Sequence, residues 1–373
     1  MIVGLKPYAL LLVIGVALAI GVNDRSGAEF GSQGCTGQAA ADYRALRSHL
    51  TRDARGSGTR YIERFGSRAS ARAWSHGQAS AAAMDVGLGC GTWGDARRSL
   101  TGLKRFQRGA SYNSEQGHGP RERYYDDNAW IGLDFIQALR MSGSVRYLDR
   151  AQGVFSFLER GFSPHGGLYW KEGQPARMRS AASNGPALQL ALHLFEGTGE
   201  QRYLDRAIEI DEFMGRHLRN PEGVIYDNVG DGGKVDRTVW SYNQGTYIGA
   251  SVQLYEATDE AEYLDRAVET AAASLTHFAE KDRLWRQPPA FNAIFFRNLL
   301  RLDAVAPDPT YRATLDAYLA RARTTARDKS GLYGGRGLGS YGEGAGTALV
   351  DQAAFVQMHA LLELSPAQLE SVA

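Results

Sequence analysis

The pentapeptide YLDRA occurs three times, 56 and 60 residues apart, at residues 147–151, 203–207 and 263–267. Each copy opens a segment whose apolar residues have helical spacing, and in the first segment one face carries Leu148, Ala151, Phe155 and Leu158. Residues 311–319 (YRATLDAYL) read as a degraded fourth copy. Internal repetition of this kind is typical of folds that are built from repeated structural units.

A second series of segments alternates with the first and is apolar on more than one side. Each member carries an amide near its start, at intervals of 49 to 60 residues: Gln78, Asn128, Asn184, Asn243, Asn292 and Gln352. A helix that is apolar all round is buried on several sides. A third series predicts turns with short extended stretches, among them HGGLYW (165–170), EGVIYDN (222–228) and SGLYGG (330–335).

This alternation predicts twelve helices in six pairs. We expect amphipathic helices near residues 38–64, 94–107, 146–160, 202–217, 262–279 and 309–326. We expect apolar helices near residues 76–88, 127–140, 185–197, 243–256, 290–303 and 350–363. Six pairs close naturally into two concentric rings with the apolar helices inside. The sequence therefore predicts an all-α (α/α)6 toroid, one domain over residues 38–373, with an open solenoid of helix pairs as the alternative.

Composition and the N-terminus limit the possible functions. The 42 basic and 41 acidic residues give a formal net charge of +1, so no strong positive field favours nucleic acid or an anionic membrane surface. Residues 1–22 contain one Lys before an apolar run that is short for a bilayer span, and Ala17 and Ala19 form a cleavage-site pattern. We expect a signal peptide there, or alternatively an uncleaved anchor, followed by a flexible lead-in at 23–37 and a secreted or cell-wall-associated monomer.

The chain has two cysteines, Cys35 and Cys90. In an exported protein this pair is compatible with one disulfide that ties the N-terminal tail to the body, and equally with two free thiols. No Cys/His cluster has the spacing of a zinc site, and no glycine-rich phosphate-binding motif occurs. We therefore expect neither a metal nor an organic cofactor.

The predicted toroid gathers the first turns of all the inner helices at one end. There the segment RYYDDNAW (123–130) places two adjacent carboxyl groups, Asp126 and Asp127, at a helix start. Glycosidases use two carboxyl groups, about 5–5.5 Å apart for retention of configuration and roughly 6.5–9.5 Å apart for inversion. Close carboxyl groups also split their pKa values, so that one stays protonated as the general acid. Helix capping is the alternative, and the neighbouring aromatic residues favour catalysis.

Other polar and aromatic residues are predicted to reach the same end. The segment WSYNQGT (240–246) and its counterparts offer rings for stacking on sugars, namely Tyr125, Trp240 and Tyr242. Amides are expected to hold sugar hydroxyl groups, namely Asn128, Asn184, Asn243 and Gln244. Asp227, in an extended stretch, is a further candidate for substrate binding. Each of these side chains has a structural alternative, as a helix cap or as a packed aromatic ring.

Together these motifs resemble glycoside hydrolase family 76, the endo-α-1,6-mannanase family. The resemblance covers residues 70–363 and is carried by YYDDNAWIGL (124–133), SNGPALQLAL (183–192), YNQGTYIGA (242–250) and DQAAFVQ (351–357). It implies an (α/α)6 barrel that cleaves α-1,6-mannosidic linkages of mannan with retention. It also implies that Asp126 is the nucleophile and Asp127 the general acid/base. Some fungal relatives resemble transglycosylases, so transfer to a sugar hydroxyl is the alternative reaction.

Three other classes of protein are alternatives to this hypothesis. A mannan-binding toroid without catalysis would bind the glycan and release no product. A terpene cyclase needs an Asp-rich magnesium motif such as DDxxD, and the fifth position here is Trp130. An epimerase on a similar toroid would need histidine bases at the inner-helix starts, where this sequence has amides.

Overall fold

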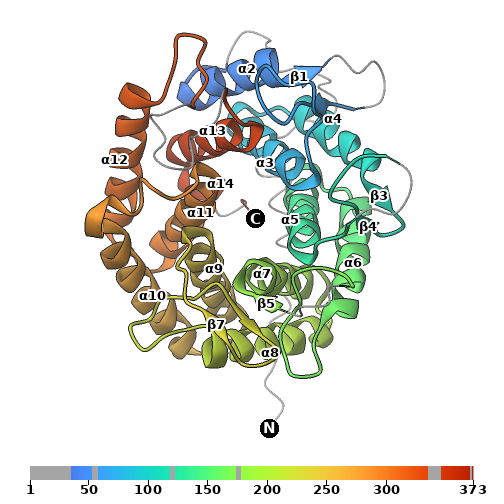
Figure 1. Ribbon diagram of the computed structural model, residues 1–373, viewed down its shortest axis with the longest axis vertical. Helices are drawn as coiled ribbons and strands as arrows, with labels where there is room; N and C mark the ends of the chain where they lie inside the picture. Colours follow the sequence, from blue (N-terminus) through green and yellow to red (C-terminus); the bar gives the residue numbers. More distant parts are fainter. Residues whose placement is uncertain are drawn as a thin grey trace.

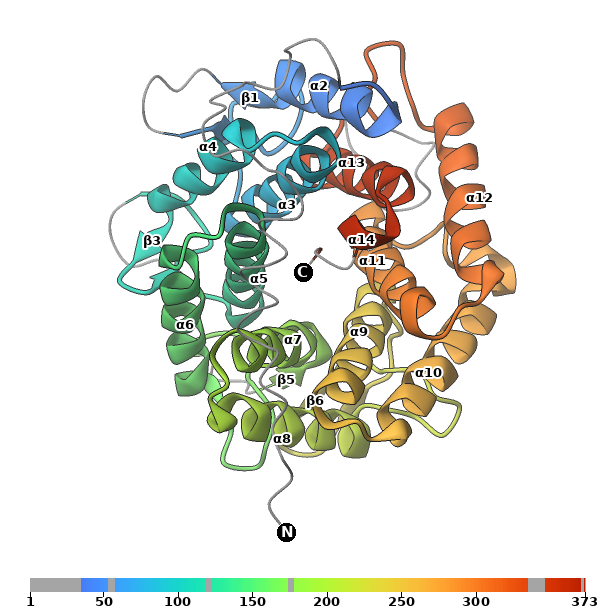
Figure 2. The same ribbon diagram turned by 180° about the vertical axis from the view of Figure 1, so that it is seen from behind.

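The computed structural model describes residues 35–52, 58–117, 122–173, 178–334, 346–369 and 372. The predicted signal peptide, and the lead-in up to residue 34, lie outside the described residues. The described chain forms two concentric rings of helices around a common axis, as Figures 1 and 2 show from the two sides. Inner and outer helices alternate along the chain, which confirms the predicted (α/α)6 toroid.

The inner ring of the described chain contains α3 (Ala73–Cys90), α5 (Tyr125–Ser142), α7 (Ala181–Thr198), α9 (Ser241–Thr258), α11 (Pro289–Val305) and α13 (Leu349–Glu363). The outer ring contains α2 (Gln38–Leu50), α4 (Gly94–Gly102), α6 (Arg146–Leu158), α8 (Gln201–His217), α10 (Ala261–Ala279) and α12 (Pro309–Thr325). A short helix, α14 (Pro366–Leu369), follows α13. No helix in the described ranges is both long enough and apolar enough to cross a membrane.

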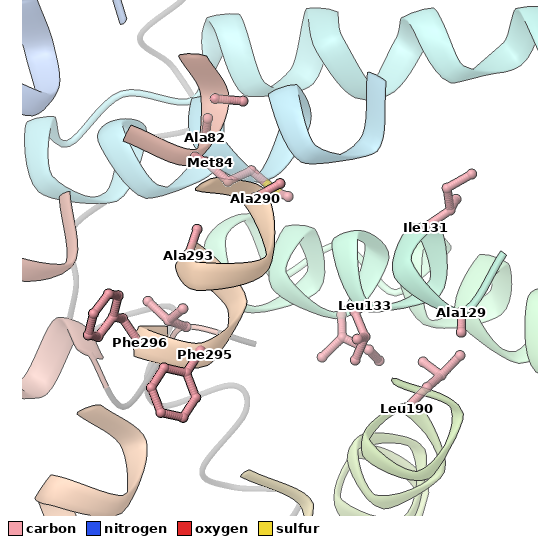
Figure 3. Close-up of a cluster of buried hydrophobic side chains, with 14 of the residues drawn as sticks. Ala82, Met84, Ala129, Ile131, Leu133, Leu190, Ala290, Ala293, Phe295 and Phe296 are labelled. Carbon is pink, nitrogen blue, oxygen red and sulfur yellow. The ribbon is translucent and has the colours of Figure 1, made fainter. Parts of the chain in front are cut away.

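The apolar pattern of each helix determines which ring it joins. In all three YLDRA copies the tyrosine and the alanine are buried, while the aspartate between them is exposed. These outer helices therefore bury one stripe and leave the other face in water. The inner helices are buried on several sides, and Figure 3 shows Ala129 of α5 facing Leu190 of α7 while Ile131 points away from it. At Gly245 of α9 an added Cβ would lie 2.6 Å from the Cα of Phe295, so glycine lets α9 and α11 approach closely.

Two predicted helices are shorter in the structure than expected. The helix expected over 38–64 ends at Leu50, and β1 (Thr51–Arg52) then pairs with β2 (Arg60–Tyr61) as a hairpin. Gly58 has a φ of 78°, and an added Cβ there would lie 2.5 Å from the backbone nitrogen of Gly102, so the chain leaves the helical path. The helix expected over 94–107 ends at Gly102 and gives way to a 3-10 turn, Leu103–Arg105.

Short strands occupy the end of the toroid where the inner helices begin. The strands β3 (Gln107–Arg108) and β4 (Ser111–Tyr112) form a hairpin before α5. A three-stranded antiparallel sheet has the order β5 (Met178–Ser180), β6 (Asn228–Gly230), β7 (Val235–Asp236). This sheet joins the loop before α7 to the loop before α9, so both loops are fixed on the same side of the ring.

Polar contacts close the ring between its first and last helices. The carboxylate of Glu363, at the end of α13, accepts the backbone N–H groups of Gln38 (2.7 Å) and Ala39 (3.1 Å) at the start of α2. The fully buried Asp42 of α2 accepts the hydroxyl of Tyr333 (3.1 Å). Because these residues are about 300 positions apart, they fasten the toroid into a closed ring.

The end of the toroid opposite the strands is closed by the two ends of the described chain. Cys35 and Cys90 form a disulfide with a Cα–Cα distance of 5.5 Å, which resolves the two alternatives left by the sequence. Val372 is buried, and its carbonyl accepts a hydrogen bond from Arg140 near the C-terminal end of α5 (3.3 Å). Val372 is thereby fastened to the inner ring.

Candidate active site

A cleft of about 740 Å³ lies at the end of the toroid where the inner helices begin. All six inner helices of the described chain contribute their first turn to it, through Trp74 (α3), Asp126 and Asp127 (α5), Ala182 (α7), Tyr242 (α9), Phe291 (α11) and Val350 (α13). The remaining lining side chains come from α3, from the second turn of α5 and from the loops and strands between helices: Glu63, Arg72, Ser75, Ser114, Glu115, Glu122, Tyr124, Trp130, Trp170, Met178, Ser180, Asp227 and Trp240. The cleft thus combines carboxyl groups with many aromatic rings.

Backbone pairing fixes the start of α5. The segments around Tyr124 and Lys171 form an antiparallel bridge, and the N–H of Tyr125 donates to the carbonyl of Trp170 (2.9 Å). The guanidinium of Arg123 binds both carboxylate oxygens of Glu172 at 2.7 and 2.6 Å. A paired guanidinium and carboxylate of this geometry is among the stronger polar contacts in proteins. Asp126 and Asp127 therefore lie at a helix start whose position is fixed by the loop that contains Trp170 and Glu172.

Asp126 accepts one N–H donor on each carboxyl oxygen. The indole Nε1 of Trp170 donates to Oδ2 (2.9 Å), and the backbone N–H of Asp127 donates to Oδ1 (2.9 Å). Burial raises the pKa of Asp126 to about 6, although both N–H donors oppose the rise because they stabilise the ionised form. The two N–H donors thus favour the carboxylate form of Asp126 and fix its orientation.

Asp127 has the opposite electrostatic environment. Burial, and then the negative charge of Asp126, raise the pKa of Asp127 well above its ordinary value. Arg72 lowers this pKa and Glu63 raises it. Two neighbouring carboxyl groups thus share the cleft with one favoured as a carboxylate and the other as an acid, which is the combination that acid-assisted nucleophilic displacement needs.

A further carboxyl group, Asp227, lines the cleft just before β6. Its two oxygens accept the side-chain amides of Asn228 (2.9 Å) and Asn243 (3.3 Å). Burial raises the pKa of Asp227, and the two amides counteract part of this rise. Asn243 is fully buried and does not line the cleft, so its contact with the cleft passes through Asp227.

Three of the amides that we expected to hold sugar hydroxyl groups are buried inside the wall instead. Asn128, Asn184 and Gln244 are fully buried, and each grips the backbone of the loop that precedes its helix. The side chain of Asn184 accepts the N–H of Leu168 (2.7 Å) and donates to the carbonyl of the same residue (3.0 Å). Asn128 holds Tyr112 in the same way, at 2.7 and 3.0 Å, and Gln244 holds Ile225, at 2.7 and 2.8 Å. With both amide ends occupied, the structure does not bring these three residues to the cleft.

Tyr125 is also outside the cleft. Its ring is buried, at 4% exposure, and stacks on Phe157 of α6 with a centroid distance of 4.9 Å. The helical period explains this placement, because Asp126, Asp127 and Trp130 share the face that looks into the ring, whereas Tyr125 and Asn128 share the outward face. Of the predicted binding residues, Trp240, Tyr242 and Asp227 do line the cleft.

Trp74, Tyr124, Trp170 and Phe291 line the cleft but were not among the binding residues predicted from the sequence. Tyr124 and Trp170 form one aromatic pair beside Asp126, with ring centroids 4.8 Å apart. Trp74, Trp240 and Tyr242 surround Phe291 and form a second aromatic cluster, with centroid distances to Phe291 of 6.1, 5.6 and 3.9 Å. The aromatic stretch HGGLYW (165–170) ends in Trp170. Its aromatic residues could have indicated that a side chain of this loop lines the cleft. Among the described residues, no three His, Cys, Asp or Glu side chains gather as a group that could hold a metal ion.

Known proteins resemble this chain in sequence and in fold. The chain is 29% identical over 171 residues to mannan endo-1,6-alpha-mannosidase DCW1 of Saccharomyces cerevisiae, a match that spans 41% of this chain but only 38% of that protein. A family 76 glycoside hydrolase (mannosidase) from Bacteroides thetaiotaomicron has a similar structure, with a TM-score of 0.76 and 24% identity over 89% of this chain and 98% of that one.

A second structural neighbour carries a bound oligosaccharide. It is an inactive variant of the α-1,6-mannanase GH76A of Salegentibacter, substituted at two adjacent aspartates and solved with α-1,6-mannotetrose. It has a TM-score of 0.73 and 20% identity, and the match covers 90% of this chain and 99% of that one. Finally, the sequence profile described as glycosyl hydrolase family 76 matches residues 53–370, most of the chain. The chain therefore belongs to glycosyl hydrolase family 76.

Proposed function

We propose that this protein hydrolyses α-1,6-mannosidic linkages in mannan-type polysaccharide by a retaining double displacement, with Asp126 as nucleophile and Asp127 as general acid/base. The observation that carries the proposal is the unequal environment of two adjacent carboxyl groups in one cleft. Asp126 accepts two N–H groups, whereas Asp127 faces the charges of Asp126 and Glu63. The yeast relative is a mannan endo-1,6-alpha-mannosidase, and the Salegentibacter variant binds α-1,6-mannotetrose; both support the choice of substrate.

In the first step the carboxylate of Asp126 attacks the anomeric carbon of a mannosyl unit. The bond between this carbon and the glycosidic oxygen breaks, and Asp127 donates its proton to the departing oxygen. A mannosyl ester of Asp126 forms, and Asp127 becomes a carboxylate. The raised pKa of Asp127 suits this step because the group must still hold its proton at the working pH.

In the second step Asp127 acts as the base. It removes a proton from a water molecule, whose oxygen attacks the anomeric carbon and displaces Asp126 as a carboxylate. Esterification of Asp126 removes the negative charge that raised the pKa of Asp127 in the first step. The pKa of Asp127 therefore falls in the ester intermediate, where it acts as a base. It rises again when displacement returns the negative charge to Asp126, and the proton taken from water then stays on Asp127.

The aromatic rings on either side of the pair are suited to hold the sugar chain. Trp240, Tyr242 and Phe291 line one part of the cleft, and Tyr124 and Trp170 line the part next to Asp126. Such rings offer apolar faces to sugar rings, and Asp227 supplies a fixed acceptor for hydroxyl groups. We propose these residues, rather than the buried amides, as the contacts with mannan.

The proposal is tested with Asp126→Asn and Asp127→Asn. Each variant should release oligosaccharides from linear α-1,6-mannan at least about 10³-fold more slowly, because each loses a group that acts in the chemical step. Thermal unfolding should show that both variants stay folded. NMR of the first product should show retention, since displacement occurs twice. If both variants keep full activity, or if the wild-type protein binds mannan without releasing product, the assignment is wrong.

Transglycosylation is the second candidate, because it shares the first step with hydrolysis. A sugar hydroxyl would replace water in the second step, and Asp127 would deprotonate it in the same way. Product analysis at rising concentrations of α-1,6-mannotriose separates the two reactions. Hydrolysis gives only shorter oligosaccharides, whereas transfer gives longer ones as well.

We also propose that the protein is exported. The disulfide between Cys35 and Cys90 supports this, because such bonds persist in oxidising compartments. The predicted signal peptide at residues 1–22 would then be removed. Mass spectrometry of the protein from the culture medium should give a mature N-terminus between the apolar run and Cys35.

A further inference from the structure

Trp170 reaches the reacting pair from a different segment of the chain. It follows the turn after α6, far from α5 in sequence, yet its indole Nε1 lies 2.9 Å from Oδ2 of Asp126. The other oxygen of Asp126 receives the backbone N–H of Asp127 at 2.9 Å. Trp170 thus provides a side-chain donor to the Asp126 carboxylate, and the backbone of Asp127 provides another.

The indole itself is held rigidly. The backbone carbonyl of Trp170 accepts the N–H of Tyr125 (2.9 Å), and its backbone N–H donates to Met178 of β5 (3.1 Å). Its ring lies against the ring of Tyr124, with centroids 4.8 Å apart. These contacts join Trp170 both to the helix that carries Asp126 and to the sheet whose strand β6 directly follows Asp227. A donor fixed in this way loses little entropy when it binds the carboxylate.

The chemistry of the donor matters because Asp126 and Asp127 are neighbours. A neutral N–H stabilises the ionised form of the one carboxylate it touches. A cation in the same place would stabilise both carboxylates, since the charge interaction falls off only slowly with distance. It would thus favour ionisation of Asp127 as well, and Asp127 must keep its proton. An uncharged donor that touches only Asp126 separates the two roles.

We propose that Trp170 is a positioning residue that holds Asp126 as an oriented carboxylate and thereby decides which of the two aspartates is the nucleophile. The inference rests on the proposed function, because it assigns Trp170 a role in that reaction. The inference goes beyond the proposed function because it names the group that distinguishes the carboxyl group of Asp126 from that of Asp127. Trp170 acts through Asp126, in addition to lining the cleft.

Two substitutions test the role of the N–H. Trp170→Phe removes the donor and keeps an aromatic ring. Site-specific incorporation of 3-benzothienylalanine at position 170 keeps the bicyclic shape and replaces the N–H with sulfur. Both should move the acidic limb of kcat/KM on α-1,6-mannotetraose to higher pH by about one unit, so that kcat/KM well below the limb falls about tenfold further than near the optimum.

The controls separate this role from packing and from the reaction itself. Trp285→Phe removes a buried tryptophan that packs against Tyr318, on the other side of the molecule's ring, and should leave the pH profile unchanged. If the benzothienyl variant keeps the wild-type acidic limb while Asp126→Asn is inactive, Trp170 only packs and the inference is wrong. If Asp126→Asn is itself active, the proposed function fails, whatever Trp170 does. Should Trp170→Phe unfold, the benzothienyl variant decides.

Discussion

At the residue scale, the proposed chemistry of this cleft depends on two aspartates whose side chains differ only in their surroundings. Asp126 accepts N–H groups on both oxygens, and Asp127 sits beside a negative charge. Glu63, which accepts the N–H of Arg72 (2.8 Å) and the hydroxyl of Ser75 (2.7 Å), adds a second negative charge on the side of Asp127. Neutral donors thus hold Asp126 and Glu63 at fixed positions in the cleft.

These surroundings predict a bell-shaped pH profile for kcat/KM. Asp126 must be ionised to attack, so activity should rise as the pH passes about 6, the raised pKa of this group. Asp127 must be protonated to assist the leaving group, so activity should fall again once the pH exceeds its more strongly raised pKa. Initial rates on α-1,6-mannotetraose across the pH range measure both limbs.

A substrate with a very good leaving group provides the control for the basic limb. Departure of a dinitrophenolate needs no proton, so on an aryl mannoside the basic limb should largely disappear and Asp127→Asn should regain much of its first-step rate. The acidic limb should stay, because Asp126 is still the nucleophile. A basic limb that persists unchanged on the aryl mannoside would contradict the role of Asp127.

At the scale of the elements, one contact repeats around the ring. The amide near the start of an inner helix clamps the backbone of the aromatic stretch that returns from the preceding outer helix. Asn184 holds Leu168, Gln244 holds Ile225, and Gln352 binds the N–H of Tyr333 (2.9 Å). The second and third repeated series of the sequence are therefore joined physically, and the clamps set the loops from which Trp170 and Asp227 enter the cleft.

Removing one clamp should lower stability more than it changes substrate affinity. Asn184→Ala leaves the buried N–H and carbonyl of Leu168 without partners, and each such group costs about 1–3 kcal/mol. We expect a loss of roughly 2–4 kcal/mol in the free energy of unfolding, measured by denaturant titration. KM for mannooligosaccharides should change little, because Asn184 does not line the cleft.

The exposed amide Gln201, which bonds Asp205 within α8 at 2.9 Å, provides the matched control. Gln201→Ala should cost less than about 0.5 kcal/mol, as is usual for surface positions. An Asn184→Ala protein as stable as Gln201→Ala, with a strongly raised KM, would instead restore the contact with sugar that the sequence first indicated.

At the scale of the whole molecule, the ring is stabilised by contacts between residues far apart in the chain. Glu363 caps α2, Asp42 binds Tyr333, and the disulfide joins Cys35 to the end of α3. Such contacts hold the first and last helix pairs together. Without them the toroid would open and expose a helix pair at each end. Their loss should therefore destabilise the closed ring without altering the cleft directly, since they lie at the seam and at the opposite end.

Breaking the disulfide should cost about 3–4 kcal/mol, because the cross-link closes a long loop whose two cysteines have a sequence separation of 55. Cys35→Ser and Cys90→Ser should each show this loss in denaturant unfolding, and the double variant should lose no more than either single variant. Reduction should lower the stability of the wild-type protein and leave that of the cysteine variants unchanged, because the variants have no disulfide to reduce. Additive losses in the double variant would show that the cysteines contribute separately rather than as a bond.

The sequence by itself determined the architecture and the catalytic candidates. Helical spacing and the repeat are local properties, so they revealed twelve helices, their alternation and the adjacent Asp126 and Asp127 at an inner-helix start. The sequence also revealed the repeated amides, but it could not show which way their side chains point. A polar side chain near a helix start can face either a ligand or a neighbouring loop. The hairpin after Leu50 was missed for a similar reason, since pairing between strands depends on residues outside the helical pattern.

Only the tertiary structure decided what surrounds the two aspartates. Trp170 meets Asp126 across 44 positions of sequence, and Cys35 meets Cys90 across 55. The helical period of α5, taken together with the closed ring, turned Tyr125 and Asn128 outward and Trp130 inward. Contacts between distant segments carry no periodic signal, yet they set the burial and the hydrogen bonds on which each pKa depends. For this reason the pair could be found from the chain alone, whereas the division of its roles on physical grounds required the fold.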